Sequence, residues 1–179
     1  RTGTTQTPFT DLSSTDWYYS PVRFAYDNGL FQGTGATVFS ANANMTRSML
    51  ATVLRRLAGV QGTVPSAGFT DVAANAWYTD AVNWAAVTGI VTGSGDGTFH
   101  PDSNVTREEM AVMLYRYAKN YMGVNVPATG DLSAFPDRAK VSSWAEEALS
   151  WAVGAGIITS RGDGTLGPGV TASRAEVAT

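Results

Sequence analysis

Cysteine is absent from the 179-residue chain, and histidine occurs once, as His100. The absence of thiols excludes a disulfide scaffold, a thiolate zinc site and a cysteine nucleophile, and a histidine-based triad or metal site would depend on that one imidazole. We therefore expect no metal and no cofactor. No segment reaches the roughly 18 apolar residues of a membrane span, so membrane insertion is not expected, and the first residues lack the charged and apolar regions of a signal peptide.

Charge is scarce as well. Lysine and arginine together number 12 and aspartate and glutamate 15, which gives a net charge of −3 and a pI of about 5.0. Because no basic tract could neutralise a series of phosphates, nucleic acid is excluded as a partner. Hydrophobic residues make up 44% of the chain, which is typical of a globular fold.

The chain consists largely of one pattern that occurs three times. Three tryptophans, at spacings of 60 and 67 residues, mark equivalent positions, and a segment ending in aspartate precedes each of them. A glycine follows each tryptophan by 12 residues and an arginine by 30. The tryptophans are Trp17, Trp77 and Trp144, the aspartates are Asp11, Asp71 and Asp137, and the arginines are Arg47, Arg107 and Arg174.

Each repeat is predicted to form a helix, a glycine-rich loop and a second helix. Apolar residues follow each tryptophan at helical spacing, and Gly33 and Gly93 lie where the loops begin. The second helix of repeat 2 opens with Thr-Arg-Glu-Glu at 106–109, where Thr106 can cap the helix and Glu109 can reach back to it. In repeat 3 only three residues follow the equivalent segment, so we expect the chain to be a piece of a longer protein that ends inside this helix.

Together these motifs resemble the S-layer homology (SLH) domain, most closely between Gly93 and Glu109 of repeat 2. The resemblance implies three tandem modules, at residues 9–60, 69–122 and 135–179, joined by linkers at 61–68 and 123–134. It also implies a mainly α fold, in which the three helix-loop-helix repeats pack as a pseudo-threefold trimer of modules around a central helical bundle.

The resemblance further implies a secreted, non-catalytic module that anchors a protein at the bacterial cell wall or S-layer. In this family the modules bind secondary cell wall polymer, often a pyruvylated and therefore anionic glycan, in grooves between modules. Other surface-layer subunits are further partners to consider. The arginine of the Thr-Arg-x-Glu motif is the main ligand contact in the family, which corresponds here to Arg47, Arg107 and Arg174.

The residues themselves also single out these arginines. A cation in the first turn of a helix opposes the helix dipole, yet all three repeats place an arginine there. Helical geometry puts Arg107 at the head of the apolar stripe, where the first-turn N–H groups should be free to bind a carboxylate or phosphate. The alternative is that Arg107 pairs with Asp71 or with an acid of a neighbouring module and only stabilises the fold.

The other candidates for the site have structural interpretations beside the ligand-binding ones. The three tryptophans could stack on a sugar, but packing in the core is the favoured interpretation. The three aspartates are best interpreted as turn or cap residues, with binding of sugar hydroxyls as the second choice. The loop glycines, such as Gly93 and Gly95, are expected to supply left-handed backbone and would also let a sugar approach the chain, and Gly33 and Gly93 are the glycines considered for the site.

Two other classes of function compete with glycan binding. Glycoside hydrolysis needs two facing carboxylates, but Glu109 and Glu176 are expected as caps. The remaining glutamates, Glu108, Glu146 and Glu147, are expected to point outward, so the chain is not predicted to be an enzyme. A protein–protein assembly module of an S-layer or surface complex is the alternative that stays open.

The repeats also differ from one another. Met49 stands in repeat 1 where the other repeats have the capping glutamate, and repeat 3 has Ser160 in place of the loop glycine and a short last helix. We therefore expect three unequal grooves, of which the one headed by Arg107 binds best.

Overall fold

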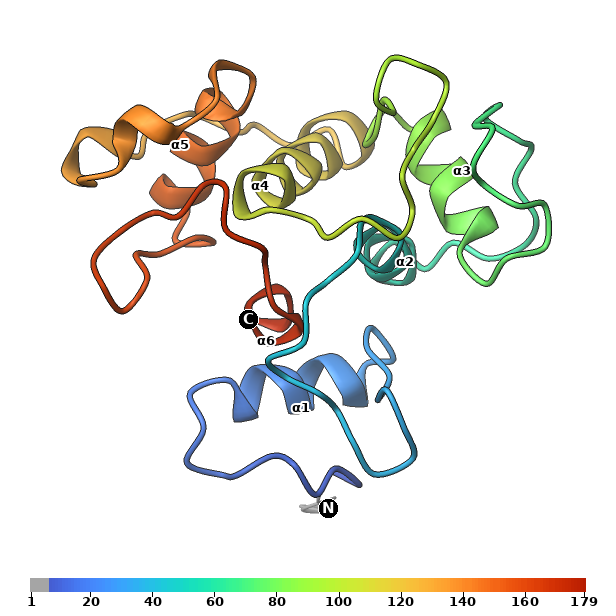
Figure 1. Cartoon of the computed structure of the whole chain (residues 1–179), viewed down its shortest axis with the longest axis horizontal. Helices are drawn as coiled ribbons and strands as arrows, with labels where there is room; N and C mark the ends of the chain where they lie inside the picture. The colour runs from blue at the N-terminus through green and yellow to red at the C-terminus, as the bar shows by residue number, and fades with distance from the viewer. Residues whose placement is uncertain (1–6) are drawn as a thin grey trace.

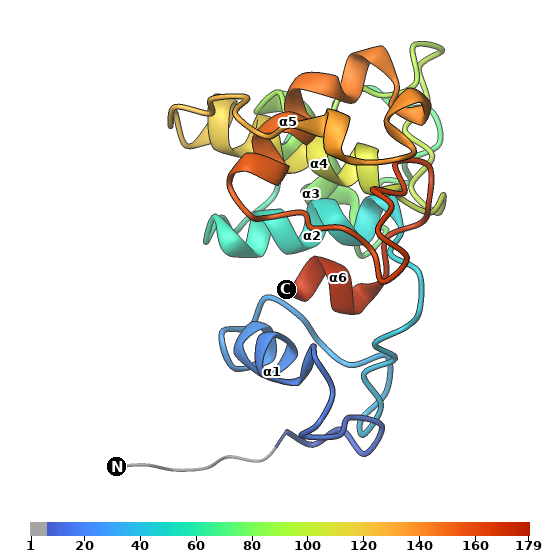
Figure 2. The ribbon, with the colours of Figure 1, turned by 90° about the vertical axis from the view of Figure 1, so that its left-hand side faces the viewer.

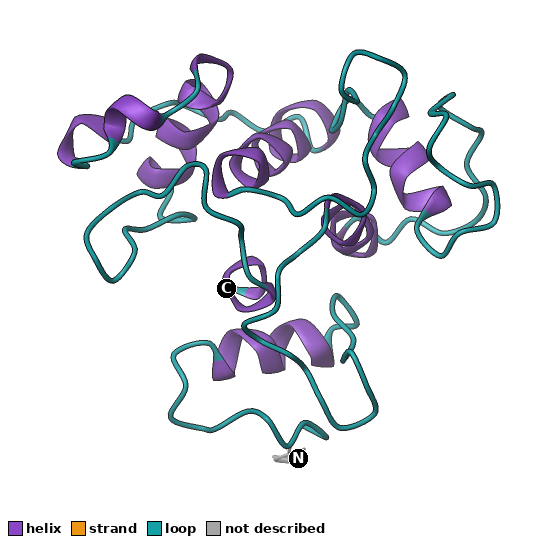
Figure 3. Cartoon of the chain, in the orientation of Figure 1, coloured by secondary structure: helices purple, strands orange, loops and turns teal. Residues whose placement is uncertain are grey.

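The computed structural model describes residues 7–179, which form helices joined by long loops (Figures 1 and 3). The chain is mainly helical, as the sequence predicts. The α-helices are α1 (Tyr19–Asp27), α2 (Arg47–Leu57), α3 (Thr79–Val87), α4 (Arg107–Arg116), α5 (Glu146–Gly154) and α6 (Arg174–Ala178). Shorter helical turns are η1 (Tyr117–Tyr121), η2 (Leu132–Ala134), η3 (Arg138–Lys140) and η4 (Ser143–Ala145). Each repeat thus supplies two α-helices in succession.

Hydroxyl caps begin the second helix of each repeat. The side-chain oxygen of the cap accepts a hydrogen bond from the backbone N–H three residues on, at 3.2 Å in each case, which satisfies a donor that the helix itself leaves open. The caps are Thr46, Thr106 and Ser173. In α6 Glu176 completes the predicted capping box by accepting from the Ser173 N–H at 2.8 Å. In α4 the expected role of Glu109 is wrong, because its carboxylate binds Arg47 instead.

Packing between repeats follows a cyclic order. The second helix of each repeat lies against the first helix of the next, so that α2 packs on α3 and α4 packs on α5. Helix α6 completes the cycle by packing on α1 (Figures 1 and 2). Each pair of packed helices therefore combines two repeats, and the apolar faces of a single repeat are covered by its neighbours.

One residue from each repeat joins a closed triangle of backbone hydrogen bonds. The N–H of Val105 donates to the carbonyl of Met45 at 2.8 Å, that of Ala172 to Val105 at 2.9 Å, and that of Met45 to Ala172 at 2.9 Å. All three residues are fully buried. Because a buried backbone group without a partner is costly, loss of any one repeat would leave groups of the other two unsatisfied. The triangle therefore couples the three repeats.

A large apolar side chain attaches the loop of each repeat to the core. These side chains are Phe39, Phe99 and Leu166, and all are fully buried, which stabilises the fold by about 1.5–3 kcal/mol each. The backbone beside them is held by the predicted turn aspartates. In repeat 2 the N–H groups of Phe99 and His100 donate to the two carboxylate oxygens of Asp71 at 2.8 and 2.7 Å. Asp11 and Asp137 accept the same pair of bonds in their own repeats, so the turn interpretation is confirmed.

Lowering the pH is expected to weaken these loop contacts. Desolvation disfavours the ionised form of Asp71, but the hydrogen bonds from Phe99 and His100 outweigh it and hold the pKa below its ordinary value of 3.8. A lowered folded-state pKa contributes stability that is present above the unfolded pKa and is lost as the pH falls through the folded value. Asp71→Asn should therefore lower the free energy of unfolding by about 1–2 kcal/mol at about pH 7 and by much less at about pH 2.

Urea denaturation at the two pH values measures this difference. Asp27→Asn is the control, because Asp27 pairs with Arg23 at 3.5 Å on the surface of α1 and holds no loop. A loss for Asp71→Asn that is the same at both pH values, or no greater than that of the control, would contradict the role of Asp71.

Candidate functional site

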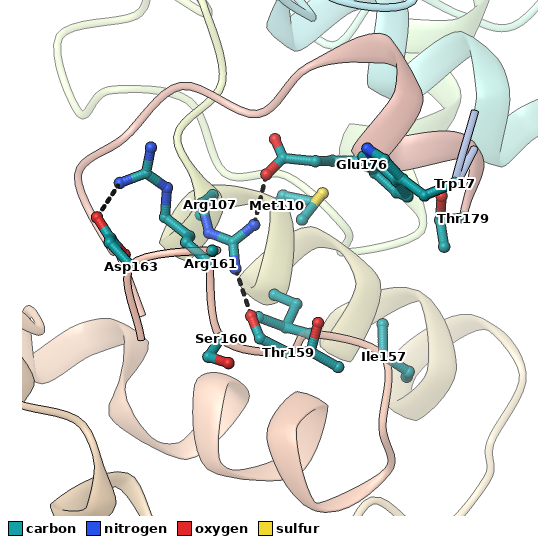
Figure 4. A pocket seen from close by; sticks show the side chains of 12 residues that line it. Trp17, Arg107, Met110, Ile157, Thr159, Ser160, Arg161, Asp163, Glu176 and Thr179 are labelled. Carbon is teal, nitrogen blue, oxygen red and sulfur yellow. Dashed lines mark hydrogen bonds and ion pairs between the residues drawn. The ribbon is translucent and has the colours of Figure 1, made fainter. Parts of the chain in front are cut away.

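Groove A is a cavity of about 640 Å³ that residues of all three repeats line. Repeat 1 contributes Trp17, repeat 2 contributes Arg107, and repeat 3 contributes the 157–163 loop and Glu176 (Figure 4). The site is therefore a product of the packing between repeats, since no single repeat contains its parts.

Groove B, of about 350 Å³, is built from equivalent residues, each of which comes from the preceding repeat in the cyclic order. Trp144 comes from repeat 3 and Arg47 from repeat 1. The loop at 90–93 and Glu109 come from repeat 2. Grooves A and B thus share one combination of a tryptophan, an arginine and a glutamate.

Arg107 is buried in the wall of groove A, with its side chain only 6% exposed. Its Nε donates to the carbonyl of Leu166 at 2.9 Å and its Nη2 to that of Thr159 at 2.8 Å. Its Nη1 lies 2.7 Å from a carboxylate oxygen of Glu176 (Figure 4). The positive charge is therefore balanced inside the protein by an acid of the next repeat.

Arg47 makes the corresponding contacts in groove B. Its Nε donates to the carbonyl of Phe99 at 2.9 Å, its Nη1 lies 3.2 Å from Glu109, and its guanidinium stands 4.8 Å from the Phe99 ring. The alternative interpretation of Arg107, an ion pair with an acid of a neighbouring module, is thus confirmed, and the same pairing occurs at Arg47. Ligand binding by these arginines stays a prediction.

The predicted anion site at the helix N-terminus is wrong. The N–H groups of Arg107 and Glu108 donate to the carbonyls of Val170 and Pro168 at 2.8 and 3.0 Å, and that of Glu109 donates to the cap. The first two N–H groups of α2 and of α6 donate in the same way to loop carbonyls of the next repeat. These donors hold the repeats together and are not available to a ligand.

Arg174 has the equivalent position in α6 but pairs with no acid among residues 7–179. Its Nε and Nη2 donate to the carbonyls of Phe39 and Gln32 at 3.0 and 2.5 Å, and its guanidinium lies 4.7 Å from the Phe39 ring. Desolvation lowers the pKa of Arg174, and the charge of Asp11 opposes this. The residue of repeat 1 that is equivalent to the pairing glutamates of repeats 2 and 3 is Met49, so no carboxylate is supplied to Arg174 from that position.

The three tryptophans are exposed, so the favoured interpretation that they pack in the core is wrong. Trp17 and Trp77 are each 63% exposed and Trp144 is 59% exposed. The rings of Trp17 and Trp77 lie edge-on against the tyrosine that follows each of them, with centroids 5.2 Å apart. An exposed indole that lines a groove has a face available to a sugar ring.

The predicted aspartates line neither groove A nor groove B. They are Asp11, Asp71 and Asp137, whose carboxylate oxygens already accept from loop N–H groups. Gly93 does line groove B; it has a φ of 73°, and a Cβ there would lie 2.6 Å from the Phe69 ring. At Gly33 a Cβ would lie 2.5 Å from the Phe9 ring. Packing therefore requires both glycines, and their contact with a ligand stays a prediction.

Two further arginines line the grooves, although the comparison of repeats did not single them out. Arg161 lines groove A and pairs with Asp163 at 3.3 Å. Arg116, the last residue of α4, lines groove B. The sequence does contain a pattern that indicates Arg116: it lies seven residues after Glu109, and this spacing places both side chains on one face of the helix.

Glu108 is buried, so the expectation that it points outward is wrong. Its carboxylate accepts hydrogen bonds from the N–H and the hydroxyl of Ser142 at 3.0 and 2.8 Å. Glu147 accepts from the Tyr115 hydroxyl at 2.7 Å. Both carboxylates connect repeat 2 to repeat 3.

Residues 7–179 contain neither a metal-binding cluster of side chains nor a membrane-spanning helix. No group of three or more histidine or carboxylate side chains between residues 7 and 179 is arranged to hold a metal ion. None of the helices in that range has the length and apolar character needed to cross a bilayer. His100 lies exposed in its loop, with its ring 2.9 Å from the Thr98 hydroxyl.

These observations define a class of protein made of tandem modules that form their grooves jointly. The model of the S-layer homology domain matches the chain three times, at residues 8–48, 68–111 and 134–178. The chain therefore belongs to the S-layer homology family and carries three tandem SLH modules.

Similar proteins include both enzymes and surface proteins. An endoglucanase of Bacillus sp. (strain KSM-635) is 29% identical over 171 residues, which are 96% of this chain and 18% of that protein. The surface-layer 125 kDa protein of Lysinibacillus sphaericus is 29% identical over 63% of this chain and 10% of its own length. The cellulosome-anchoring protein of Acetivibrio thermocellus is 27% identical over 97% of this chain and 38% of its own length. The chain thus spans less than half of each of these relatives.

Supplying the missing acid in repeat 1 is expected to stabilise the protein. Met49→Glu would place a carboxylate beside Arg174 as Glu176 lies beside Arg107, whereas Met49→Gln loses the same apolar contact without adding charge. The glutamate variant should have a free energy of unfolding about 0.5–1.5 kcal/mol above that of the glutamine variant. Urea denaturation measures the difference, and equal stabilities would show that repeat 1 does not follow the geometry of the other two.

Proposed function

We propose that this chain is a non-catalytic, cell-surface anchoring module that binds an anionic cell wall polymer in the grooves between its repeats. The observation that carries the proposal is the combination, in both groove A and groove B, of an exposed tryptophan with an arginine from another repeat. Two relatives are named as a surface-layer protein and a cellulosome-anchoring protein, which supports a secreted location at the bacterial cell wall or S-layer.

The two side chains suit the two parts of an acidic sugar. An indole can cover the apolar face of a sugar ring, and a guanidinium can hold a carboxylate through charge-assisted hydrogen bonds. Arg107 uses three of the five N–H groups of a guanidinium within the protein, so it can donate to a ligand without releasing Glu176.

The proposed ligand is a secondary cell wall polymer with a pyruvylated end group. A pyruvate ketal carries one carboxylate on one sugar ring, which matches a groove that presents cationic and aromatic side chains together. Other surface-layer subunits are proposed as additional partners.

The proposed arrangement is a pseudo-threefold trimer of the modules at 9–60, 69–122 and 135–179. The cyclic packing of helices and the triangle of Met45, Val105 and Ala172 support it. The central helical bundle has less support, since the main helix contacts join α2 to α3, α4 to α5 and α6 to α1.

Catalysis is not part of the proposal. The endoglucanase that resembles this chain is matched over only 18% of its length, so its name describes a much larger protein. The competing function is a protein–protein assembly module, and binding to isolated cell walls before and after extraction of their polymer distinguishes it from a polymer anchor.

Removing the indole of groove A tests the proposal. Trp17→Ala should weaken co-sedimentation with isolated bacterial cell walls by about twofold to tenfold, because an aromatic contact of this kind contributes about 0.5–1.5 kcal/mol. Phe24→Ala is the matched control, since Phe24 lies in α1 of the same repeat, is 64% exposed and lines neither groove. Equal binding by the two variants would count against groove A.

The same walls stripped of their non-peptidoglycan polymer identify the ligand class. A polymer anchor should no longer co-sediment after stripping. Binding that survives the extraction would overturn the proposal, and binding that instead depends on wall proteins would favour the assembly module.

A further inference from the structure

One face of α4 forms a wall of groove B. Glu109, Val112, Met113 and Arg116 all line the groove, and their spacing of three, four and seven residues places them on the same side of the helix. The helical rise puts Arg116 about 10 Å from Glu109 along the axis of α4. Groove B therefore has Arg47 and Glu109 together at one end and Arg116 at the other, with two apolar side chains between them.

The two arginines of groove B differ in what balances their charge. Arg47 lies 3.2 Å from the carboxylate of Glu109, so that end of the groove carries no net charge. Within residues 7–179 no carboxylate lies within 4.0 Å of the Arg116 guanidinium. Desolvation lowers the pKa of Arg116. Arg116 is a half-buried cation whose charge the described part of the chain leaves unbalanced.

Other arginines near the grooves pair with an acid or donate to a carbonyl. In groove A both arginines pair with acids, so their charges cancel. Arg56 of α2 is the residue equivalent to Arg116 of α4. It donates to the carbonyl of Leu30 at 3.2 Å and lines neither groove A nor groove B. Among the residues that line groove B there is thus one positive charge in excess, and Arg116 provides it.

We infer that Arg116 binds the anionic group of the ligand in groove B and makes this groove select a carboxylate-bearing saccharide over a neutral one. The inference rests on the proposed function and names the residue that decides specificity in one of its sites. Trp144 lines the same groove and supports the sugar ring while the carboxylate lies at the Arg116 end.

A pair of matched ligands separates the effect of charge from that of the sugar. The probes are a methyl hexopyranoside that carries a 4,6-pyruvate ketal and its 4,6-isopropylidene analogue, in which a methyl group replaces the carboxylate. The indole N–H signals of Trp144 and Trp17 report on groove B and groove A separately in ¹⁵N–¹H NMR spectra. Single Trp→Phe variants assign them. The ketal should shift the Trp144 signal at lower concentration than the neutral analogue does.

Substitution of Arg116 should affect only the charged ligand and only groove B. Arg116→Gln is expected to weaken ketal binding at Trp144 about tenfold, as loss of a charge-assisted hydrogen bond does. Binding of the neutral analogue at Trp144 and of the ketal at Trp17 should not change, which also shows that the variant is folded. Arg116→Lys should recover most of the affinity because it keeps the charge, and Arg56→Gln is the matched control that should leave Trp144 unaffected.

The outcomes separate this inference from the proposed function. Ketal binding at Trp144 that Arg116→Gln leaves intact, or an equal loss for ketal and analogue, overturns the role of Arg116 but not glycan binding. If the ketal perturbs neither Trp144 nor Trp17 in the unmodified chain, both the inference and the pyruvylated ligand are overturned.

Discussion

The closed triangle of backbone hydrogen bonds among Met45, Val105 and Ala172 is the constraint on which the other contacts between repeats depend. Each member directly precedes the cap of a second helix, so the triangle brings the first turns of α2, α4 and α6 against the loop of the next repeat. The N–H groups of those turns find acceptors in that loop. The arginine at the first helical position enters the same loop, and this accounts for a cation where the helix dipole disfavours one.

Because the arginines belong to the contacts between repeats, their neighbours decide how much charge each groove presents. Glu109 and Glu176 balance Arg47 and Arg107, whereas Met49 leaves Arg174 among carbonyls and aromatic rings. A single departure from a repeated motif therefore changes the electrostatics of one site while the fold stays the same. An array of three modules can in this way carry sites of different preference on one backbone arrangement.

The tryptophans show where reasoning from one repeat at a time fails. A large aromatic residue beside the apolar stripe of its own helix is more often buried, and Val22, five residues after Trp17, is fully buried. Yet Trp17 lines a groove whose other walls come from repeats 2 and 3. The same limit applies to Glu108, whose partner Ser142 lies 34 residues further along the chain in another repeat.

By itself the sequence determined the three repeats, their order of helix, loop and helix, the hydroxyl caps and the turn aspartates. Each of these depends on residues within one repeat, where spacing along the chain implies proximity in space. Only the tertiary structure decided that Arg107 meets Glu176, 69 residues away, and that the first-turn donors of α4 are occupied. It also decided that Arg116 lies in groove B with no balancing acid among residues 7–179. The charge of a groove is a sum over segments from different repeats, and folding alone brings those segments together.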